Sequence, residues 1–199
     1  MKKPLIIFLL VIGLSGITFG QIRFGPTVEL GYGMYSNKSD KIDLKGGISP
    51  AFGITFDKYL NYWSTLRVSA LYSFKTLKTV RKSDDKADKM NGQFVDLCLA
   101  GRFSDFDDAK STLPYGMFGF GAVFNVASTG QTVYMKTCAY KQVIPYVTVG
   151  VGTGIKLTFF SSVDVSINYS RFLAPMFVNP LDAKDAKLNQ FSLKFAGLF

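Results

Sequence analysis

The sequence predicts an all-β fold, an eight-stranded antiparallel up-and-down transmembrane β-barrel with a filled lumen. Three observations support this prediction: apolar and polar residues alternate with a period of two, eight segments show the alternation, and long and short connections follow each other. Such alternation is typical of strands whose two faces meet different environments. An even number of these strands is typical of outer-membrane barrels.

The composition of the 199 residues excludes several other classes of protein. A hydrophobic fraction of 48% and an aromatic fraction of 15% are too high for a disordered chain. Two cysteines are too few for a disulfide-stapled small domain or a four-cysteine zinc site. The chain contains no histidine, which excludes every mechanism that needs an imidazole as a metal ligand, a general base or a pH switch.

The first 20 residues have the three parts of a secretory signal peptide. Lys2 and Lys3 precede an apolar run over residues 5–14, and small and polar residues follow that run. The run is shorter than the ~20 residues that a membrane-spanning helix needs. We therefore expect cleavage after Gly20, so that residues 21–199 form the barrel domain.

The alternating segments have the length of membrane-spanning strands. In the first segment the even positions are apolar, as at Phe24, Val28 and Leu30, whereas the odd positions carry small or polar residues. Segments of about 10–15 residues can cross a bilayer with a tilt and project beyond it. The eight segments cover residues 24–34, 44–56, 62–76, 92–103, 113–127, 143–157, 163–170 and 190–199.

The connections between the segments alternate in length. Those after the second and sixth segments are short (57–61 and 158–162), and the one after the fourth is intermediate (104–112). This rhythm is typical of a barrel with a periplasmic amino terminus, short periplasmic turns and long outer loops. The four long, polar connections cover residues 36–43, 77–91, 128–142 and 174–187.

The alternation alone fits both a membrane barrel and a soluble, lipocalin-like barrel. The polar rows distinguish the two, because they are rich in small residues such as Gly31, Ser69 and Gly121 rather than in long charged side chains. Small residues fit the narrow interior of an eight-stranded barrel, which has no room for a channel. We therefore expect an integral outer-membrane protein with lipid-facing apolar side chains and extracellular loops.

The rows assigned to the lumen also carry charged side chains. Buried charges must be paired or hydrogen-bonded, so we expect an ion-pair network inside the barrel. An anion-binding pocket is the alternative, because the basic residues outnumber the acidic ones. The residues concerned are Arg23, Glu29, Lys45, Arg67, Lys75, Asp96, Arg102, Lys156, Asp164 and Lys194. Aromatic residues near segment ends, among them Tyr115 and Tyr146, are expected in interfacial girdles.

Two stretches and the end of the chain resemble a known family. Residues 114–121 (PYGMFGFG) and 145–152 (PYVTVGVG) start strands with Pro-Tyr and continue with alternating glycines, and residues 195–199 read FAGLF. Together with the signal peptide, they resemble the PorT-like outer-membrane β-barrel family over essentially the whole mature chain. The resemblance implies that Phe195 and Phe199 form the insertion signal that the barrel-insertion machinery reads. It implies an architecture rather than an activity, since members include accessory factors of secretion systems.

The sequence contains no constellation of catalytic residues. Enzymatic outer-membrane barrels resemble this chain in location, but their known sites use histidine, which is absent here. The acidic pairs Asp84-Asp85 and Asp107-Asp108 fall in connections, and adjacent strand residues would face opposite ways. No nucleotide-binding glycine loop occurs in a strand–helix context. We therefore expect no enzyme, no catalytic residue, no cofactor and no metal site.

Cys98 falls on the lumen side of the fourth segment, whereas Cys138 falls in the third long connection. This placement disfavours the Cα separation of roughly 4.4–6.8 Å that a disulfide requires. Expected partners are the barrel-insertion machinery during assembly, other outer-membrane proteins, and lipid and lipopolysaccharide, whose phosphates suit basic loops such as 75–89. The net charge of +9 does not imply nucleic acid in a secreted barrel.

These observations lead to one functional hypothesis and one alternative. The hypothesis is a non-enzymatic outer-membrane barrel that acts as an accessory or structural subunit of a larger complex for secretion, insertion or uptake. The alternative is a free-standing surface binder or adhesin that acts through its long loops. A subunit would co-purify with a fixed set of partners, whereas a free binder would not.

The first prediction concerns Phe199, the last residue of the sequence. Replacing it with alanine removes the terminal aromatic ring of the expected insertion signal, so we expect loss of outer-membrane assembly. The amount of heat-modifiable, folded barrel in isolated outer membranes measures this loss. Unchanged assembly of the Phe199→Ala variant would count against the barrel hypothesis.

Overall fold

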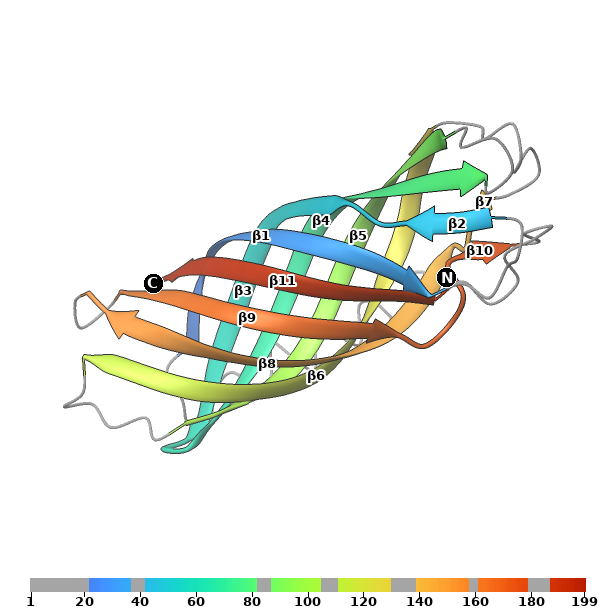
Figure 1. Cartoon of the computed structure of the whole chain (residues 1–199). Coiled ribbons are helices and arrows are strands. Elements are labelled where there is room, and N and C mark those ends of the chain that lie inside the picture. Colours follow the sequence, from blue (N-terminus) through green and yellow to red (C-terminus); the bar gives the residue numbers. More distant parts are fainter. Residues whose placement is uncertain are drawn as a thin grey trace, which may run out of the picture.

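The computed structural model describes residues 22–36, 42–81, 87–104, 111–129, 139–157, 161–178 and 187–199. Within these ranges, eight long strands close into an antiparallel β-barrel (Figure 1), which confirms the predicted fold class. The expected signal peptide, residues 1–20, lies outside the described ranges. The long strands are β1 (Ile22–Ser36), β3 (Ile48–Asn61), β4 (Ser64–Arg81), β5 (Ala87–Phe103), β6 (Thr112–Thr129), β8 (Val143–Lys156), β9 (Ser162–Phe172) and β11 (Lys187–Leu198).

The first and last long strands close the barrel. β1 and β11 pair without interruption from Thr27–Ala196 to Ser36–Lys187. Beyond this ladder, Phe24 and Phe199 exchange two backbone hydrogen bonds of 3.1 and 2.9 Å between their amide and carbonyl groups. The last residue of the chain therefore completes the seam, while its role as an insertion signal stays a prediction. In the described part of the chain, no helix is long and apolar enough to cross a membrane.

Three short strands lie at the end of the barrel opposite the carboxyl terminus (Figure 1). β2 (Ile42–Lys45) pairs with the distal part of β4, from Ile42–Arg81 to Lys45–Lys78. β7 (Ala139–Tyr140) and β10 (Phe177–Val178) pair with each other. The expected long loops start at this same end, which we call the outer end.

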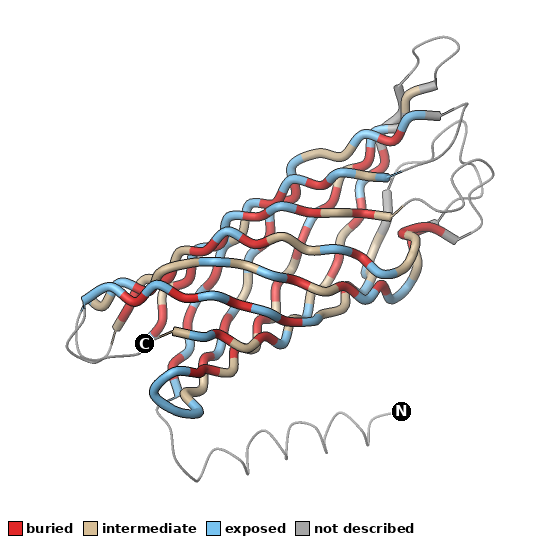
Figure 2. Tube along the Cα trace, turned by 60° about the horizontal axis from the view of Figure 1, so that its bottom comes forward, coloured by how far each residue is buried: buried red, intermediate tan, exposed pale blue. Residues whose placement is uncertain are grey.

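Burial alternates residue by residue along the strands (Figure 2). In β1, Arg23 and Thr27 are buried inside the barrel, whereas Phe24 and Val28 face outward and are 56% and 55% exposed. Large apolar side chains are exposed in this way on every long strand. A contiguous apolar surface of this size is typical of a wall that faces lipid rather than water.

The second segment departs from the expected parity. Gly46 and Gly47 interrupt the strand between β2 and β3, and the Gly47 carbonyl accepts a hydrogen bond from the Gly33 amide at 3.0 Å. Across this interruption the inward row changes from even numbers in β2, where Leu44 is buried, to odd numbers in β3, where Ser49 and Ala51 are buried. The expectation that Leu44 faces lipid is therefore wrong, because it assumed one unbroken alternation from residue 44 to residue 56.

Two tyrosine–glycine pairs join β6 to β8 inside the barrel. Tyr115 pairs in register with Gly152, and Gly121 pairs with Tyr146. Each strand carries its tyrosine and its glycine six residues apart, so antiparallel pairing sets the tyrosine of one strand against the glycine of the other. The glycines leave the space that the rings occupy: a Cβ atom added at Gly152 would lie 2.5 Å from the Tyr115 Oη.

The second prediction follows from this close approach. A Gly152→Ala substitution brings a Cβ within 2.6 Å of both the Tyr115 ring and the Val165 carbonyl oxygen, and overpacking of this kind costs about 1–3 kcal/mol. Urea unfolding of the barrel in detergent micelles measures the loss. Gly116→Ala on β6 is the matched control, because a Cβ at Gly116 meets nothing within 4 Å. Equal stabilities for the two variants would contradict the packing role of Gly152.

Candidate functional site

The strands bring most of the predicted charged residues together inside the barrel. Six of the ten are buried, namely Arg23, Arg67, Lys75, Arg102, Asp164 and Lys194. Glu29, Asp96 and Lys156 are partly buried on the same inward rows. Their position follows from local sequence, since each stands on the polar row of an alternating strand whose apolar row faces outward. Two separate clusters result.

The lower cluster, near the end where β11 finishes, consists of two arginines, two aspartates and a tyrosine. Asp57 accepts hydrogen bonds from Nε and Nη2 of Arg67 at 2.7 and 2.8 Å, and it also bonds to Arg102. Asp164 accepts bonds from Arg67 Nη1 and Arg102 Nη2, both at 2.8 Å. Each aspartate therefore bridges both arginines in a closed square.

Tyr115 completes the lower cluster. Its hydroxyl donates a hydrogen bond of 2.7 Å to Asp164 Oδ1, and the Arg102 guanidinium lies over its ring, 3.8 Å from the centroid. Charge-assisted hydrogen bonds of this kind are roughly twice as strong as neutral ones. The four charges balance, so the square has the composition of a structural cross-link rather than of a binding site for a further ion.

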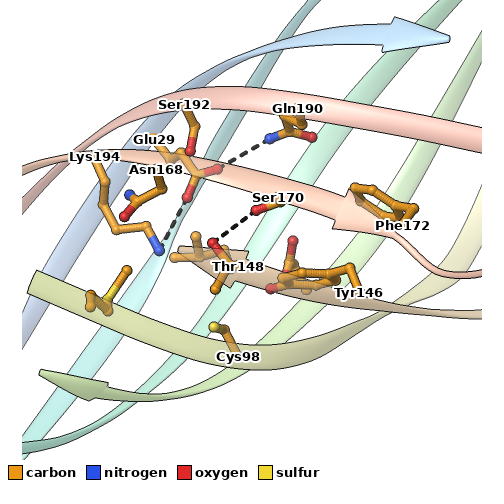
Figure 3. A pocket seen from close by; sticks show the side chains of 13 residues that line it. Glu29, Cys98, Tyr146, Thr148, Asn168, Ser170, Phe172, Gln190, Ser192 and Lys194 are labelled. Carbon is orange, nitrogen blue, oxygen red and sulfur yellow. Dashed lines mark hydrogen bonds and ion pairs between the residues drawn. The ribbon is translucent and has the colours of Figure 1, made fainter. Parts of the chain in front are cut away.

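The upper cluster lies nearer the outer end, since Glu29 stands six residues further along β1 than Arg23, the residue paired with Asp57; Figure 3 shows the cluster from close by. Figure 3 shows Lys194 and Gln190 converging on the Glu29 carboxylate, with Nζ–Oε2 and Nε2–Oε1 distances of 3.2 Å each. Gln190 in turn accepts a hydrogen bond of 2.8 Å from Lys75. Gln190 thus connects the lysine of β4 to the glutamate of β1.

The upper cluster also includes an aspartate and a tyrosine. The Tyr146 hydroxyl donates a hydrogen bond of 2.5 Å to Asp96, and Asp96 interacts electrostatically with Lys75. A cavity of about 20 Å³ lies among these side chains and beside Cys98. This volume holds about one water molecule, so the anion-binding alternative has little room here.

An apolar cluster covers the upper ion cluster on its outer side. Phe172, Tyr146 and Ile144 line its lower part, and Phe177 of β10 and Tyr140 of β7 lie above them with ring centroids 5.1 Å apart. Its remaining buried members are Leu44, Leu77, Met90, Phe94, Val123, Met176 and Leu188. From the inner to the outer end of the barrel, the interior thus contains the ion square, the upper ion cluster and the apolar cluster, in that order.

Lys45 is the exception among the ten predicted residues. Its side chain is 60% exposed, and its Nζ lies 4.0 Å from the carboxylate of Asp43, also on β2. The change of parity at Gly46 and Gly47 turns Lys45 outward when it turns Leu44 inward. The expectation that Lys45 belongs to the lumen network is therefore corrected.

The structure also adds a residue that the sequence interpretation missed. Asp57 was expected in a short turn over residues 57–61, but β3 extends to Asn61, and Asp57 is buried at the centre of the lower cluster. The inward parity of Ser49, Ala51 and Thr55 continues to Asp57. Following that parity two residues further would have identified it.

Tyr115 and Tyr146 do not form part of an interfacial girdle. They are 5% and 4% exposed and lie inside the barrel. The aromatic residues that do face outward include Tyr32 and Trp63, which are 54% and 48% exposed. The difference has a physical reason: each inward tyrosine finds a glycine opposite it and an aspartate within reach of its hydroxyl.

The predicted insertion signal and the two cysteines complete the set of predicted residues. Phe195 and Phe199 face outward on the wall. Cys98 is a free, partly buried cysteine on the inward face of β5, whereas Cys138 lies outside the described ranges. Within those ranges, no group of three or more Cys, Asp or Glu residues could hold a metal ion.

The fold and its lipid-facing wall define a small antiparallel barrel of the outer-membrane type. Solved structures with this fold include the outer membrane protein OprG from Pseudomonas aeruginosa, which aligns with a TM-score of 0.63 at 12% identity over 89% of this chain and 92% of OprG. Neisserial surface protein A aligns with a TM-score of 0.54 at 12% identity, over 90% and 98% of the two chains. The outer membrane protein AlkL, solved in lipid bilayers, aligns with a TM-score of 0.54 at 12% identity, over 92% and 91%.

The likeness is one of fold, and with the apolar wall it indicates an integral outer-membrane β-barrel protein. The sequence matches no protein-family model. It matches no curated protein either. The resemblance to the PorT-like family therefore stays a prediction.

The third prediction concerns the lower cluster. Replacing Asp57 with asparagine leaves Arg67 and Arg102 buried with half of their negative partners, and breaking a buried ion pair costs about 3–5 kcal/mol. Urea unfolding of the folded barrel in lipid vesicles measures the change in the free energy of unfolding. Asp43→Asn removes the exposed partner of Lys45 and should cost about 1 kcal/mol or less. A similarly small cost for Asp57→Asn would refute the structural role of the square.

Proposed function

We propose that this protein is a non-enzymatic outer-membrane barrel that acts as an accessory or structural subunit of a larger outer-membrane complex, for secretion, insertion or uptake. In this proposal the barrel is an anchor that conducts no solute. It docks on its partner through the part of the sheet that projects beyond the outer end. We call this part the outer extension, and it comprises residues 42–45 of β2, 77–81 of β4 and 87–90 of β5.

The filled interior supports an anchor rather than a pore. The ion square, the upper cluster and the apolar cluster follow each other along the barrel axis. Two cavities among the described side chains measure about 20 and 10 Å³. Eight strands enclose a space that side chains can fill, and these volumes are too small for a solute larger than water.

The outer extension is a continuous piece of sheet. The β4–β5 ladder runs from Ser64–Phe103 to Val80–Ala87, whereas the neighbouring β3–β4 ladder reaches only Ala51–Ser73. On its inner face, Leu44, Leu77 and Met90 are buried in the apolar cluster. This packing fixes the extension to the barrel, and a fixed surface suits docking because little ordering entropy is lost on binding.

A pair of lysines on the extension carries the proposal. The register places Lys45 of β2 directly opposite Lys78 of β4, and both side chains are exposed. Like charges in such positions destabilise a sheet. Lysines on edge strands prevent unwanted strand pairing, but Lys78 lies on the central strand, where no edge needs protection. Asp43 lies 4.0 Å from the Lys45 ammonium group, and an acidic surface on a partner subunit would compensate the remaining positive charge of the pair.

An enzymatic role is disfavoured by chemistry. The chain has no histidine, and the interior carboxylates of the lower cluster already bind two arginines each. Among the barrels of similar fold, OprG and AlkL are described as outer membrane proteins and NspA as a surface protein. Their descriptions fit a protein that acts through its surfaces.

The fourth prediction tests the docking surface. We expect tagged protein, extracted from its native membranes in a mild detergent, to migrate as a high-mass species with a fixed set of partners. The variant Lys45→Gln/Lys78→Gln should lose about fivefold or more of that species, because two exposed ion pairs contribute up to about 1 kcal/mol each. Size-exclusion chromatography with mass spectrometry of the co-purified proteins provides the measurement.

The control is Lys58→Gln, which removes an outward cation of β3 near the opposite end of the barrel and should leave the complex intact. Recovery of the wild-type protein as a single chain would sink the subunit proposal and favour a free-standing binder or adhesin. A stable complex that ignores the double substitution would move the docking surface away from the outer extension.

A further inference from the structure

Arg171 occupies an unusual position on the lipid-facing wall. It stands on the outward row of β9, between Tyr169 and Leu173, and it is exposed. The residues opposite it in register are Val147 on β8 and Asn189 on β11. A charged group on the lipid face costs about 2–4 kcal/mol at the bilayer midplane and much less near the interface. The four neighbouring residues on the wall, namely Val147, Asn189, Tyr169 and Leu173, are all apolar or neutral.

The aromatic residues below Arg171 set its level in the membrane. Tyr169 and Phe191 are directly paired, with ring centroids 4.9 Å apart. The Tyr169 hydroxyl points along the wall and donates a hydrogen bond of 3.2 Å to the Asn189 Oδ1. Amphipathic rings of this kind lie at the headgroup level. Arg171 follows two residues later, a rise of about 7 Å toward the outer end.

Two further donors stand on the outward row of the neighbouring strand β11. Asn189 uses its carbonyl oxygen to accept from Tyr169, which leaves its amide nitrogen as a donor. Lys187 stands two residues beyond Asn189 on the same outward row of β11. None of the residues next to Arg171 in register or on its own row is acidic. These neighbouring positions therefore supply no carboxylate to Arg171, and an anion from the membrane can approach its exposed side chain.

We propose that Arg171, Asn189 and Lys187 form a binding site for a phosphate group of a phosphorylated glycolipid of the outer leaflet, lipopolysaccharide. The guanidinium binds the phosphate, and acyl chains lie against the apolar wall below it, along Ile167, Phe191 and Leu193. Arginine suits this role because its planar fork binds phosphate through two hydrogen bonds. The site shares no residue with the outer extension, and β8 and β6 lie between β9 and β5.

Binding of purified lipopolysaccharide to the folded barrel in detergent tests the proposal. Native mass spectrometry counts the bound glycolipid as a function of its concentration. We expect Arg171→Gln to weaken binding about tenfold or more, as the loss of a charge-assisted hydrogen-bonding pair should. Arg171→Lys keeps the charge and should weaken binding less. Heat-modifiable migration on gels verifies that each variant is folded, and Lys58→Gln, an outward cation at the opposite end, should bind like the wild type.

Two other probes identify the source of the phosphate. Enzymatically dephosphorylated lipopolysaccharide should bind about as weakly as the Arg171→Gln variant binds the intact glycolipid. Phosphatidylethanolamine should compete poorly. The proposal is overturned if Arg171→Gln binds lipopolysaccharide like the wild type, if dephosphorylation has no effect, or if phosphatidylethanolamine binds equally well, which would make the site a general phospholipid contact.

Discussion

The interior of an eight-stranded barrel is narrow, and every charged group inside it must find a partner there. The square of Asp57, Arg67, Arg102 and Asp164 meets this requirement with bonds between β3, β4, β5 and β9. A one-residue slip of any of these strands would carry a charge from the lumen to the lipid face. The square therefore fixes the register of the sheet as well as the contents of the lumen.

The basic and acidic side chains of the two interior clusters balance each other, so the net positive charge of the chain comes from other residues. The lower cluster contains two basic and two acidic side chains, and so does the upper cluster of Glu29, Lys75, Asp96 and Lys194. The interior clusters thus contribute no net charge to a chain of net charge +9. The excess of cations lies elsewhere: in the described ranges it includes Arg23, Lys58 and Lys156 toward the inner end, and Lys45, Lys78, Arg171 and Lys187 toward the outer end.

The alternation of the sequence was enough to predict the barrel, the lipid-facing wall and most of the lumen residues, because side-chain direction in a strand depends only on parity. Parity failed where the strand is interrupted: Gly46 and Gly47 reverse the faces of Leu44 and Lys45. Parity would also have placed Asp57 inside the barrel, but the polar composition of residues 57–61 led to the prediction of a turn there. Tyr115 and Tyr146 were misplaced because residue type suggests the interface, whereas the glycine opposite each ring, which makes room for it inside, depends on register. Register is a pairwise property of strands, and one strand's sequence does not contain it.

The same register links the interior to both proposed surfaces. On β9, Asp164 faces inward, and Arg171, seven residues further, must face outward because the spacing is odd. On β4, Arg67 faces inward, and Lys78, eleven residues further, faces outward for the same reason. A register that placed Arg171 or Lys78 inside would also expel Asp164 or Arg67 into lipid, where neither has a partner. The ion pairs of the buried square thus determine which basic residues face outward. Both proposed binding surfaces for anionic groups depend on that arrangement.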